Sequence, residues 1–192
     1  MPKIVTVEQM HMLESEAVSC GVSYDHMMEM AGSAVFEHIC ARITDISSKS
    51  FVVVAGPGNN GGDGFVVARL LAASGAIVNV FTINTTDNNA DNKQKALLAG
   101  ATVITPEDDY KMEIYTSEIR KADVFIDAIF GTGARVPLKS VAAKMLGIAS
   151  VELDGREVLC VAVDCPSGLD CDTGVVDEHI LYADISITFG AA

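Results

Sequence analysis

Three polar stretches of this chain follow apolar runs, and their residue types are those that bind anions or move protons. The first is Gly-Pro-Gly-Asn-Asn-Gly-Gly-Asp-Gly at 56–64, directly after the apolar run 51–55. The other two begin at Asp127 and Asp164, each also directly after a hydrophobic run. Glycines let a backbone approach a ligand closely, and a following helix offers unpaired N–H groups and a partial positive charge. We therefore expect the first stretch to bind an anion, most simply a phosphate.

The glycine-rich stretch must be distinguished from similar loops. Residues 56–61 satisfy the Gly-x-Gly-x-x-Gly pattern of dinucleotide-binding loops, which is weak evidence by itself. An NAD-dependent oxidoreductase also needs an acid at the end of the second strand, and here the first one is Asp87. A P-loop is excluded because no Gly-Lys-Ser/Thr follows. A glycine-rich turn without a ligand is the alternative, but it would not need Asn59, Asn60 and Asp63.

Asp127 and Asp164 are the candidate acid–base residues. An aspartate directly after a strand often caps the next loop or helix, and this structural role is the alternative for each. Two aspartates at corresponding strand ends, flanked by Gly131, Gly133 and Gly168, favour a shared site instead. A partly buried carboxylate there could have a raised pKa and act as a general acid or base.

The composition argues against several classes of protein. The chain has 192 residues, 13 basic and 26 acidic, and the net charge of −13 disfavours nucleic-acid binding. No apolar run is long enough to cross a membrane, and the N-terminus lacks the features of a signal peptide. The five cysteines are odd in number and include no Cys-x-x-Cys pair, so we expect free thiols and a cytoplasmic protein.

The elements that would position these residues alternate between helices and strands. We expect a single domain over 1–192, with two N-terminal helices at about 6–42 and a sheet domain at about 50–190. This order predicts an α/β fold with a doubly wound, mostly parallel sheet, which binds ligands beyond the carboxyl ends of its strands. The predicted strands are 51–55, 77–83, 102–104, 124–127, 157–163 and 185–189, and the predicted sheet-domain helices are 65–74, 88–98, one opening at Thr105, and 138–151.

Methionines recur at helical spacing in the second predicted helix. Met27, Met30, Ala34 and Ile39 fit one buried stripe, in which the methionines would fill the core. A binding surface is the alternative for these methionines. A last strand that ends so close to residue 192 indicates a chain trimmed at its C-terminus.

Three motifs together resemble the YjeF N-terminal domain family. They are Gly-Pro-Gly-Asn-Asn-Gly-Gly-Asp-Gly (56–64), Asp-Ala-Ile-Phe-Gly-Thr-Gly (127–133) and Val-Asp-Cys-Pro-Ser-Gly-Leu-Asp (163–170). Segments 7–10 and 28–32 are also similar to the family's N-terminal helices, so the resemblance covers nearly the whole chain. It implies a Rossmann-like three-layer αβα sandwich, often assembled as a homodimer. In many bacteria and archaea the family's domain is fused to an NAD(P)HX dehydratase.

The resemblance also implies a role for each site residue. Asn60, Asp127 and Ser167 match the positions that hold a potassium ion in the family, expected once per subunit, and oxygen ligands suit such a hard cation. Asp127 is the first candidate for the general acid or base, and Asp164 is the second. The residues that would bind the nucleotide are Asn59, Asn60, Gly61, Gly62, Asp63, Gly131, Thr132, Gly133, Ala134, Arg135, Val136, Pro137 and Asp164.

The leading hypothesis is therefore an NAD(P)H-hydrate epimerase, an isomerase that interconverts the R and S forms of hydrated NADH and NADPH in nicotinamide nucleotide repair. The alternative is a non-catalytic nucleotide-sensing or protein-interaction module of the same fold. Adapter domains of that kind tend to erode the loop and aspartate motifs, whereas this chain keeps all three. A small-molecule substrate is expected, without nucleic-acid or membrane partners.

Overall fold

The computed structural model describes residues 5–84 and 89–189 and is built around one six-stranded sheet. The strand order is β3-β2-β1-β4-β5-β6, and every neighbouring pair is parallel. The order reverses between β1 and β4, so the edge beyond their carboxyl ends is where a ligand is expected. The strands are β1 (Ser50–Ala55), β2 (Ile77–Thr82), β3 (Thr102–Ile104), β4 (Val124–Ala128), β5 (Leu159–Val163) and β6 (Ile185–Ile187).

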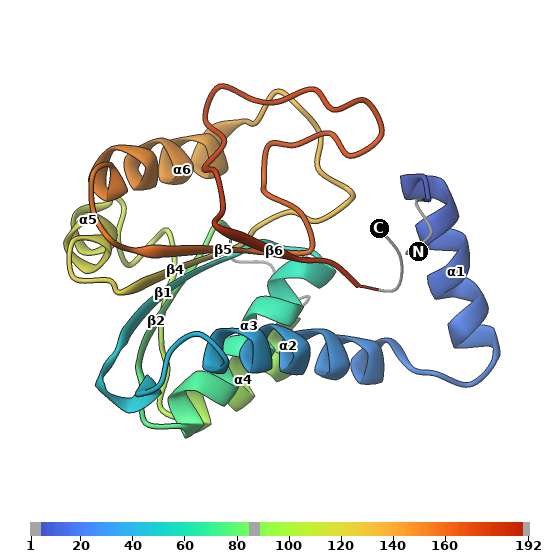
Figure 1. The fold of residues 1–192 in the computed structure, drawn as a ribbon, viewed down its shortest axis with the longest axis horizontal. Helices are drawn as coiled ribbons and strands as arrows, with labels where there is room; N and C mark the ends of the chain where they lie inside the picture. The colour runs from blue at the N-terminus through green and yellow to red at the C-terminus, as the bar shows by residue number, and fades with distance from the viewer. Residues whose placement is uncertain (1–4, 85–88, 190–192) are drawn as a thin grey trace.

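Helices cover both faces of the sheet, as Figure 1 shows, with α2, α3 and α4 on one side and α5 and α6 on the other. This confirms the predicted Rossmann-like three-layer αβα sandwich. Helix α1 belongs to neither layer and stands apart from them (Figure 1). The helices are α1 (Val7–Ser19), α2 (Tyr24–Cys40), α3 (Asn59–Ala73), α4 (Ala90–Leu98), α5 (Glu113–Ile119) and α6 (Ser140–Leu153), with a 3-10 turn at Ile46–Ser48.

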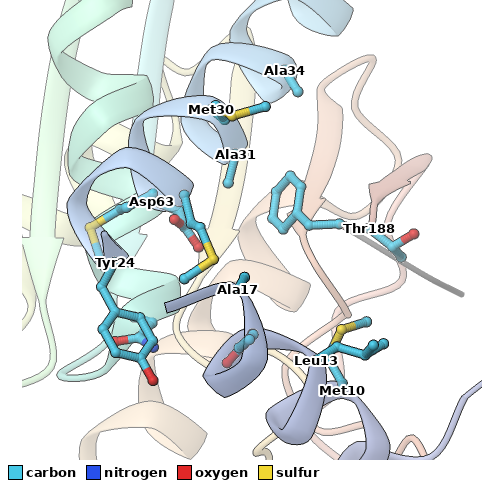
Figure 2. A pocket seen from close by; sticks show the side chains of 14 residues that line it. Met10, Leu13, Ala17, Tyr24, Met30, Ala31, Ala34, Asp63 and Thr188 are labelled. Carbon is cyan, nitrogen blue, oxygen red and sulfur yellow. The ribbon is translucent and has the colours of Figure 1, made fainter. Parts of the chain in front are cut away.

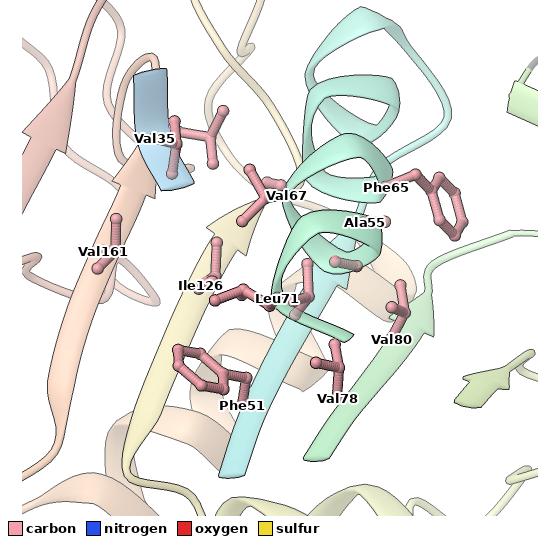
Figure 3. Packing of buried hydrophobic residues seen from close by; sticks show 14 of the residues in the cluster. Val35, Phe51, Ala55, Phe65, Val67, Leu71, Val78, Val80, Ile126 and Val161 are labelled. Carbon is pink, nitrogen blue, oxygen red and sulfur yellow. The ribbon is translucent and has the colours of Figure 1, made fainter. Parts of the chain in front are cut away.

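Strand β1 shows why the sheet needs two helical layers. Phe51, Val53 and Ala55 pack into the core on the side of α2 and α3, part of which Figure 3 shows. Val52 and Val54 alternate with them and pack into the core on the side of α5 and α6. All five side chains are fully buried, as expected for a central strand of a parallel sheet.

Helix α3 begins at Asn59, six residues before the predicted start at Phe65, so the glycine-rich stretch is largely helical. The prediction failed because glycine is a poor helix former, and local propensity argued for a loop. Tertiary packing decides instead. A Cβ atom on Gly61 would lie 1.9 Å from the carbonyl oxygen of Gly56, and one on Gly64 would lie 2.6 Å from Ala128 Cβ. These glycines allow the helix to approach the ends of β1 and β4.

The predicted buried stripe on α2 is correct at Ile39 and wrong at Met30. The buried residues of this helix are Gly32, Val35 and Ile39, whereas Met30 is 60% exposed. The cause is a close crossing of α2 over α3, since a Cβ atom on Gly32 would lie 2.5 Å from Val66 Cβ. That contact turns Met30 away from the core.

Smaller differences concern where elements begin and end. Thr105 does not open a helix, because its N–H and hydroxyl both donate to Asp108 Oδ2 in a local turn, and α5 starts later, at Glu113. Strands β5 and β6 are shorter than predicted. Asp87 and Asn88, like the C-terminal residues 190–192, lie outside the described residues. Within residues 5–84 and 89–189, no helix is both long and apolar enough to cross a membrane.

Candidate functional site

The three polar stretches meet at the carboxyl edge of the sheet, as the sequence predicted. The N–H of Gly56 donates to the carbonyl of Ala128 at 2.9 Å, which joins the first stretch to the second. The contact is close enough that a Cβ atom on Gly56 would lie 1.8 Å from Ile129 O. The second stretch is joined to the third through Asp127 and Asp164.

Asp127 is 3% exposed and is held by hydrogen bonds from the protein. Ser167 donates twice, from its N–H to Oδ2 at 2.7 Å and from its hydroxyl to Oδ1 at 2.6 Å. The N–H of Ile129 donates to Oδ1 at 3.2 Å, and Ser167 Oγ also accepts from the N–H of Phe130 at 2.9 Å. Burial raises the pKa of Asp127, although these hydrogen bonds act in the opposite direction. The carboxyl group therefore ties two loops together.

Asp164 fixes the loop that follows Asp127. Its Oδ2 accepts from the N–H of Thr132 at 2.7 Å, and a Cβ atom on Gly131 would lie 2.2 Å from the same oxygen. Its backbone is left-handed, with φ of 65°, a conformation that costs a non-glycine residue about 1–2 kcal/mol. Burial raises the pKa of Asp164. Strain and burial at this residue are typical of a functional site.

Asn60 is a buried amide without a protein partner. It lies in the first turn of α3 and is 8% exposed, and neither its Oδ1 nor its Nδ2 has a hydrogen-bond partner among the described residues. Leaving a buried polar group unpaired costs about 1–3 kcal/mol, so such a group is a candidate ligand for an ion or a substrate.

Asp63 lies one turn further along α3 and is 8% exposed. Burial, with the nearby negative charges of Asp164 and Glu14, raises its pKa to about 8. The carboxyl group of Asp63 is therefore mostly neutral at pH 7, which sequence analysis did not anticipate.

Two cavities lie on either side of α1. The first, of about 630 Å³, is shown in Figure 2. The second measures about 590 Å³. The first is lined by Met10, Leu13, Glu14, Ala17, Tyr24, Met27, Met28, Met30, Ala31, Ala34, Asn59, Asp63, Thr188 and Phe189. The second is lined by Val7, Glu8, His11, Met12, Ser15, Thr132, Gly133, Ala134, Arg135, Asp170, Cys171 and Asp172.

The predicted nucleotide-binding residues divide between these cavities and the protein interior. Asn59 and Asp63 line the first cavity, and residues 132–135 line the second. Gly61 and Gly62 instead face protein atoms, since a Cβ atom on Gly62 would lie 2.4 Å from the sulfur of a methionine of α2. The loop continues through a cis peptide bond between Val136 and Pro137.

Sequence analysis missed Asp177, which anchors the far end of the loop. Its Oδ2 accepts from the N–H of Leu138 at 2.6 Å, and its Oδ1 accepts from the N–H of His179 at 2.8 Å. No local pattern marks this residue. The α2 methionines line the first cavity, which agrees with the alternative given for them from the sequence and not with the expected role as core filler.

The parallel sheet, its reversal between β1 and β4, and the polar edge at that point define a Rossmann-like α/β domain with a ligand site at the switch point. The chain belongs to the family described as YjeF-related protein N-terminus, whose sequence model matches residues 24–192. A solved structure titled "Crystal structure of yeast ynu0, YNL200c" has the same fold, with a TM-score of 0.84 and 24% identity over 97% of this chain and 79% of the yeast chain.

Named relatives are similar over nearly the whole chain. The NAD(P)H-hydrate epimerase of Limosilactobacillus reuteri (strain ATCC 55730 / SD2112) is 34% identical over 189 residues, which are 97% of this chain and 84% of the relative. The bifunctional NAD(P)H-hydrate repair enzyme Nnr of Thermofilum pendens is 36% identical over 193 residues, 98% of this chain. Those residues make up only 36% of that bifunctional relative. These names favour the enzyme hypothesis over the non-catalytic module.

Proposed function

We propose that this chain is an NAD(P)H-hydrate epimerase that interconverts the R and S forms of hydrated NADH and NADPH. The observation that carries the proposal is the pair of carboxyl groups, Asp63 and Asp164, whose pKa values burial raises at the switch point. Raising the pKa of a carboxyl group toward the working pH makes it a better general acid or base. The names of the relatives specify the substrate on which such groups would act.

The chemistry needs one proton to leave an oxygen and one to reach a nitrogen. The inverted carbon carries a hydroxyl group and the ring nitrogen. Loss of the hydroxyl proton, with cleavage of the carbon–nitrogen bond and protonation of the nitrogen, opens the ring to an aldehyde. Rotation and reclosure on the other face give the epimer. Asp164 fits proton transfer better than Asp127, whose oxygens both accept hydrogen bonds from the protein.

A potassium ion bound by Asn60, Asp127 and Ser167 is part of the proposal. The unpaired amide of Asn60 supports it, and the carboxylate and hydroxyl oxygens of the other two residues suit a hard cation. The described residues contain no cluster of three or more His, Cys, Asp or Glu side chains for a transition metal. When bound, the ion would supply positive charge beside the substrate's phosphates and the nearby aspartates.

Assembly and partners follow as further parts of the proposal. Exposed apolar side chains on α1 and α2, with Met12 66%, Tyr24 50% and Met30 60% exposed, support a homodimer. A dehydratase that consumes one epimer, fused or separate, is the expected metabolic partner, because an epimerase alone removes no hydrate. The free cysteines support a cytoplasmic location.

The direct test is the conversion of purified R-NADHX to the S form, followed by chromatography that resolves the epimers, with and without potassium. We expect conversion well above the spontaneous rate, and a loss of at least about tenfold in kcat/KM for Asp164→Asn. The exposed variant Asp154→Asn, at the end of α6, is the matched control and should behave as wild type. Binding of the hydrate without acceleration would refute the epimerase and favour the non-catalytic module.

A further inference from the structure

The cavity between α1, α2 and the end of β6 has a mostly apolar wall. Figure 2 shows Met10 and Leu13 of α1 opposite Met30, Ala31 and other side chains of α2. Its volume of about 630 Å³ lies within the range of about 300–1,000 Å³ that is usual for small-molecule sites. Methionine side chains are flexible and polarisable, so they adapt to ligands of irregular shape.

Asp63 is the buried carboxyl group at the inner end of this cavity. Its side chain is directed into the cavity (Figure 2), it is 8% exposed, and no described residue donates a hydrogen bond to it. The groups that face it are acidic: Glu14 from α1 and Asp164 from the end of β5. A carboxyl group placed among apolar walls and two acids holds its proton at neutral pH.

A neutral carboxyl group has both a donor and an acceptor. Its O–H can donate one hydrogen bond while its carbonyl oxygen accepts another. Asp127, by contrast, has both oxygens occupied by donors of the protein. In Asp164, Oδ2 accepts from the N–H of Thr132. Asp63 differs from both because neither of its oxygens accepts a hydrogen bond from a described residue, so its donor and its acceptor are both open to a ligand in the cavity.

Building on the epimerase function proposed above, we propose that this cavity receives the hydrated nicotinamide ring and that Asp63 exchanges protons with it as a catalytic residue. The hydrated ring occupies the space between the methionine side chains. The rest of the dinucleotide extends from the cavity along the switch point, where Asn59 marks the boundary of the cavity.

The proposed step balances without any added reagent. The carboxylic O–H of Asp63 gives its proton to the ring nitrogen as the carbon–nitrogen bond breaks, and that bond's electron pair remains on nitrogen. The carbonyl oxygen of Asp63 accepts the substrate's hydroxyl proton as the carbon–oxygen bond becomes a carbonyl. The carboxyl group ends the step neutral, with its two oxygens exchanged in role, and the reverse step on the other face closes the ring.

The first test compares Asp63→Asn with wild type in the epimerisation assay. Since a positioned acid–base group contributes about 10²–10⁴ in rate, we expect kcat to fall by at least about a hundredfold with KM nearly unchanged. Formate should restore part of the activity of Asp63→Ala, because formic acid can supply the missing carboxyl group, and a purely structural role would not be rescued. A kcat within threefold of wild type in Asp63→Asn, or no rescue by formate, would overturn the catalytic role.

The second test fills the cavity without touching Asp63. Ala31 lines the cavity on α2, so Ala31→Leu should raise KM by at least about tenfold, since the ring loses its space. The matched control is Ala73→Leu, on the exposed end of α3, which should leave KM and kcat unchanged. An unchanged KM in Ala31→Leu would place the ring elsewhere. If the wild-type protein does not epimerise NADHX, the proposed epimerase function is refuted. If the wild type is active and neither Asp63→Asn nor Ala31→Leu changes its kinetics, only the proposed role of this cavity and of Asp63 is refuted.

Discussion

Removing the hydroxyl group of Ser167 should destabilise the whole domain, because this group joins two loops of the site. Ser167 is fully buried, and its Oγ donates to Asp127 at 2.6 Å while it accepts from the N–H of Phe130 at 2.9 Å. A hydrogen bond to a charged group contributes about 1.5–3 kcal/mol, and a neutral one about 1 kcal/mol. We therefore expect Ser167→Ala to lower the free energy of unfolding by about 2–4 kcal/mol.

The loss should also depend on pH. Burial raises the pKa of Asp127 in the folded state, and the hydroxyl of Ser167 is one of the groups that limit this rise. Without it, the folded pKa rises further while the unfolded pKa is unchanged. In the folded variant Asp127 therefore holds its proton more tightly than in folded wild type. The stability that the variant loses relative to wild type is thus smallest at acid pH, and it grows as pH rises through the folded pKa of Asp127.

Urea denaturation in potassium-free buffer at acid and alkaline pH measures both effects. The midpoint should shift at constant m, and at neutral pH the melting temperature should fall by about 5–15 °C. Ser74→Ala is the control. The hydroxyl of Ser74 donates to the backbone carbonyl of Leu70 at 2.9 Å, but Ser74 is exposed at the end of α3. A loss below about 0.5 kcal/mol in Ser167→Ala, as expected for a surface change, would refute this account of the loops.

Three other expectations use matched variants or conditions. Gly131→Ala should lower stability and activity, because its Cβ would lie 2.2 Å from Asp164 Oδ2. Gly133→Ala is the control and should fold as wild type, since no atom lies within 4 Å of its added Cβ. Equal melting temperatures of the two variants would contradict this expectation. Without potassium, Asn60→Leu should be at least as stable as wild type, because it removes an unpaired buried amide. With potassium, the variant should be about 1–3 kcal/mol less stable than wild type. Thermal melts that give the same difference between variant and wild type in both buffers would argue against the cation. Because the pKa of Asp63 is raised to about 8 by burial, Asp164 and Glu14, its contribution to stability is present at acid pH and is lost between about pH 4 and 8. Wild type should therefore lose up to about 1.4 kcal/mol per pH unit relative to Asp63→Asn over that range, and parallel curves from urea titrations would show that this carboxyl group is ionised throughout.

The sequence by itself determined the sheet and the edge at which the site lies. Residues 51–55 are apolar at every position, which indicates a strand buried on both faces. Asp127 lies at the end of one further strand and Asp164 directly follows another, and the carboxyl ends of parallel strands share one edge. Periodicity and strand-end position are local properties of the chain, so these features could be predicted without tertiary information.

Only the tertiary structure decided which side chains at that edge are buried, which are neutral and which are open to a ligand. Asn59 begins a helix because Gly61 packs against Gly56, a contact that outweighs the low helix propensity of glycine. Asp63 acquires its raised pKa from burial and from acids on α1 and after β5, far away in sequence. The exposure of Met30 likewise depends on how α2 crosses α3. The burial and the charge environment of a side chain depend on neighbours from distant segments of the chain. A local sequence pattern does not contain that information.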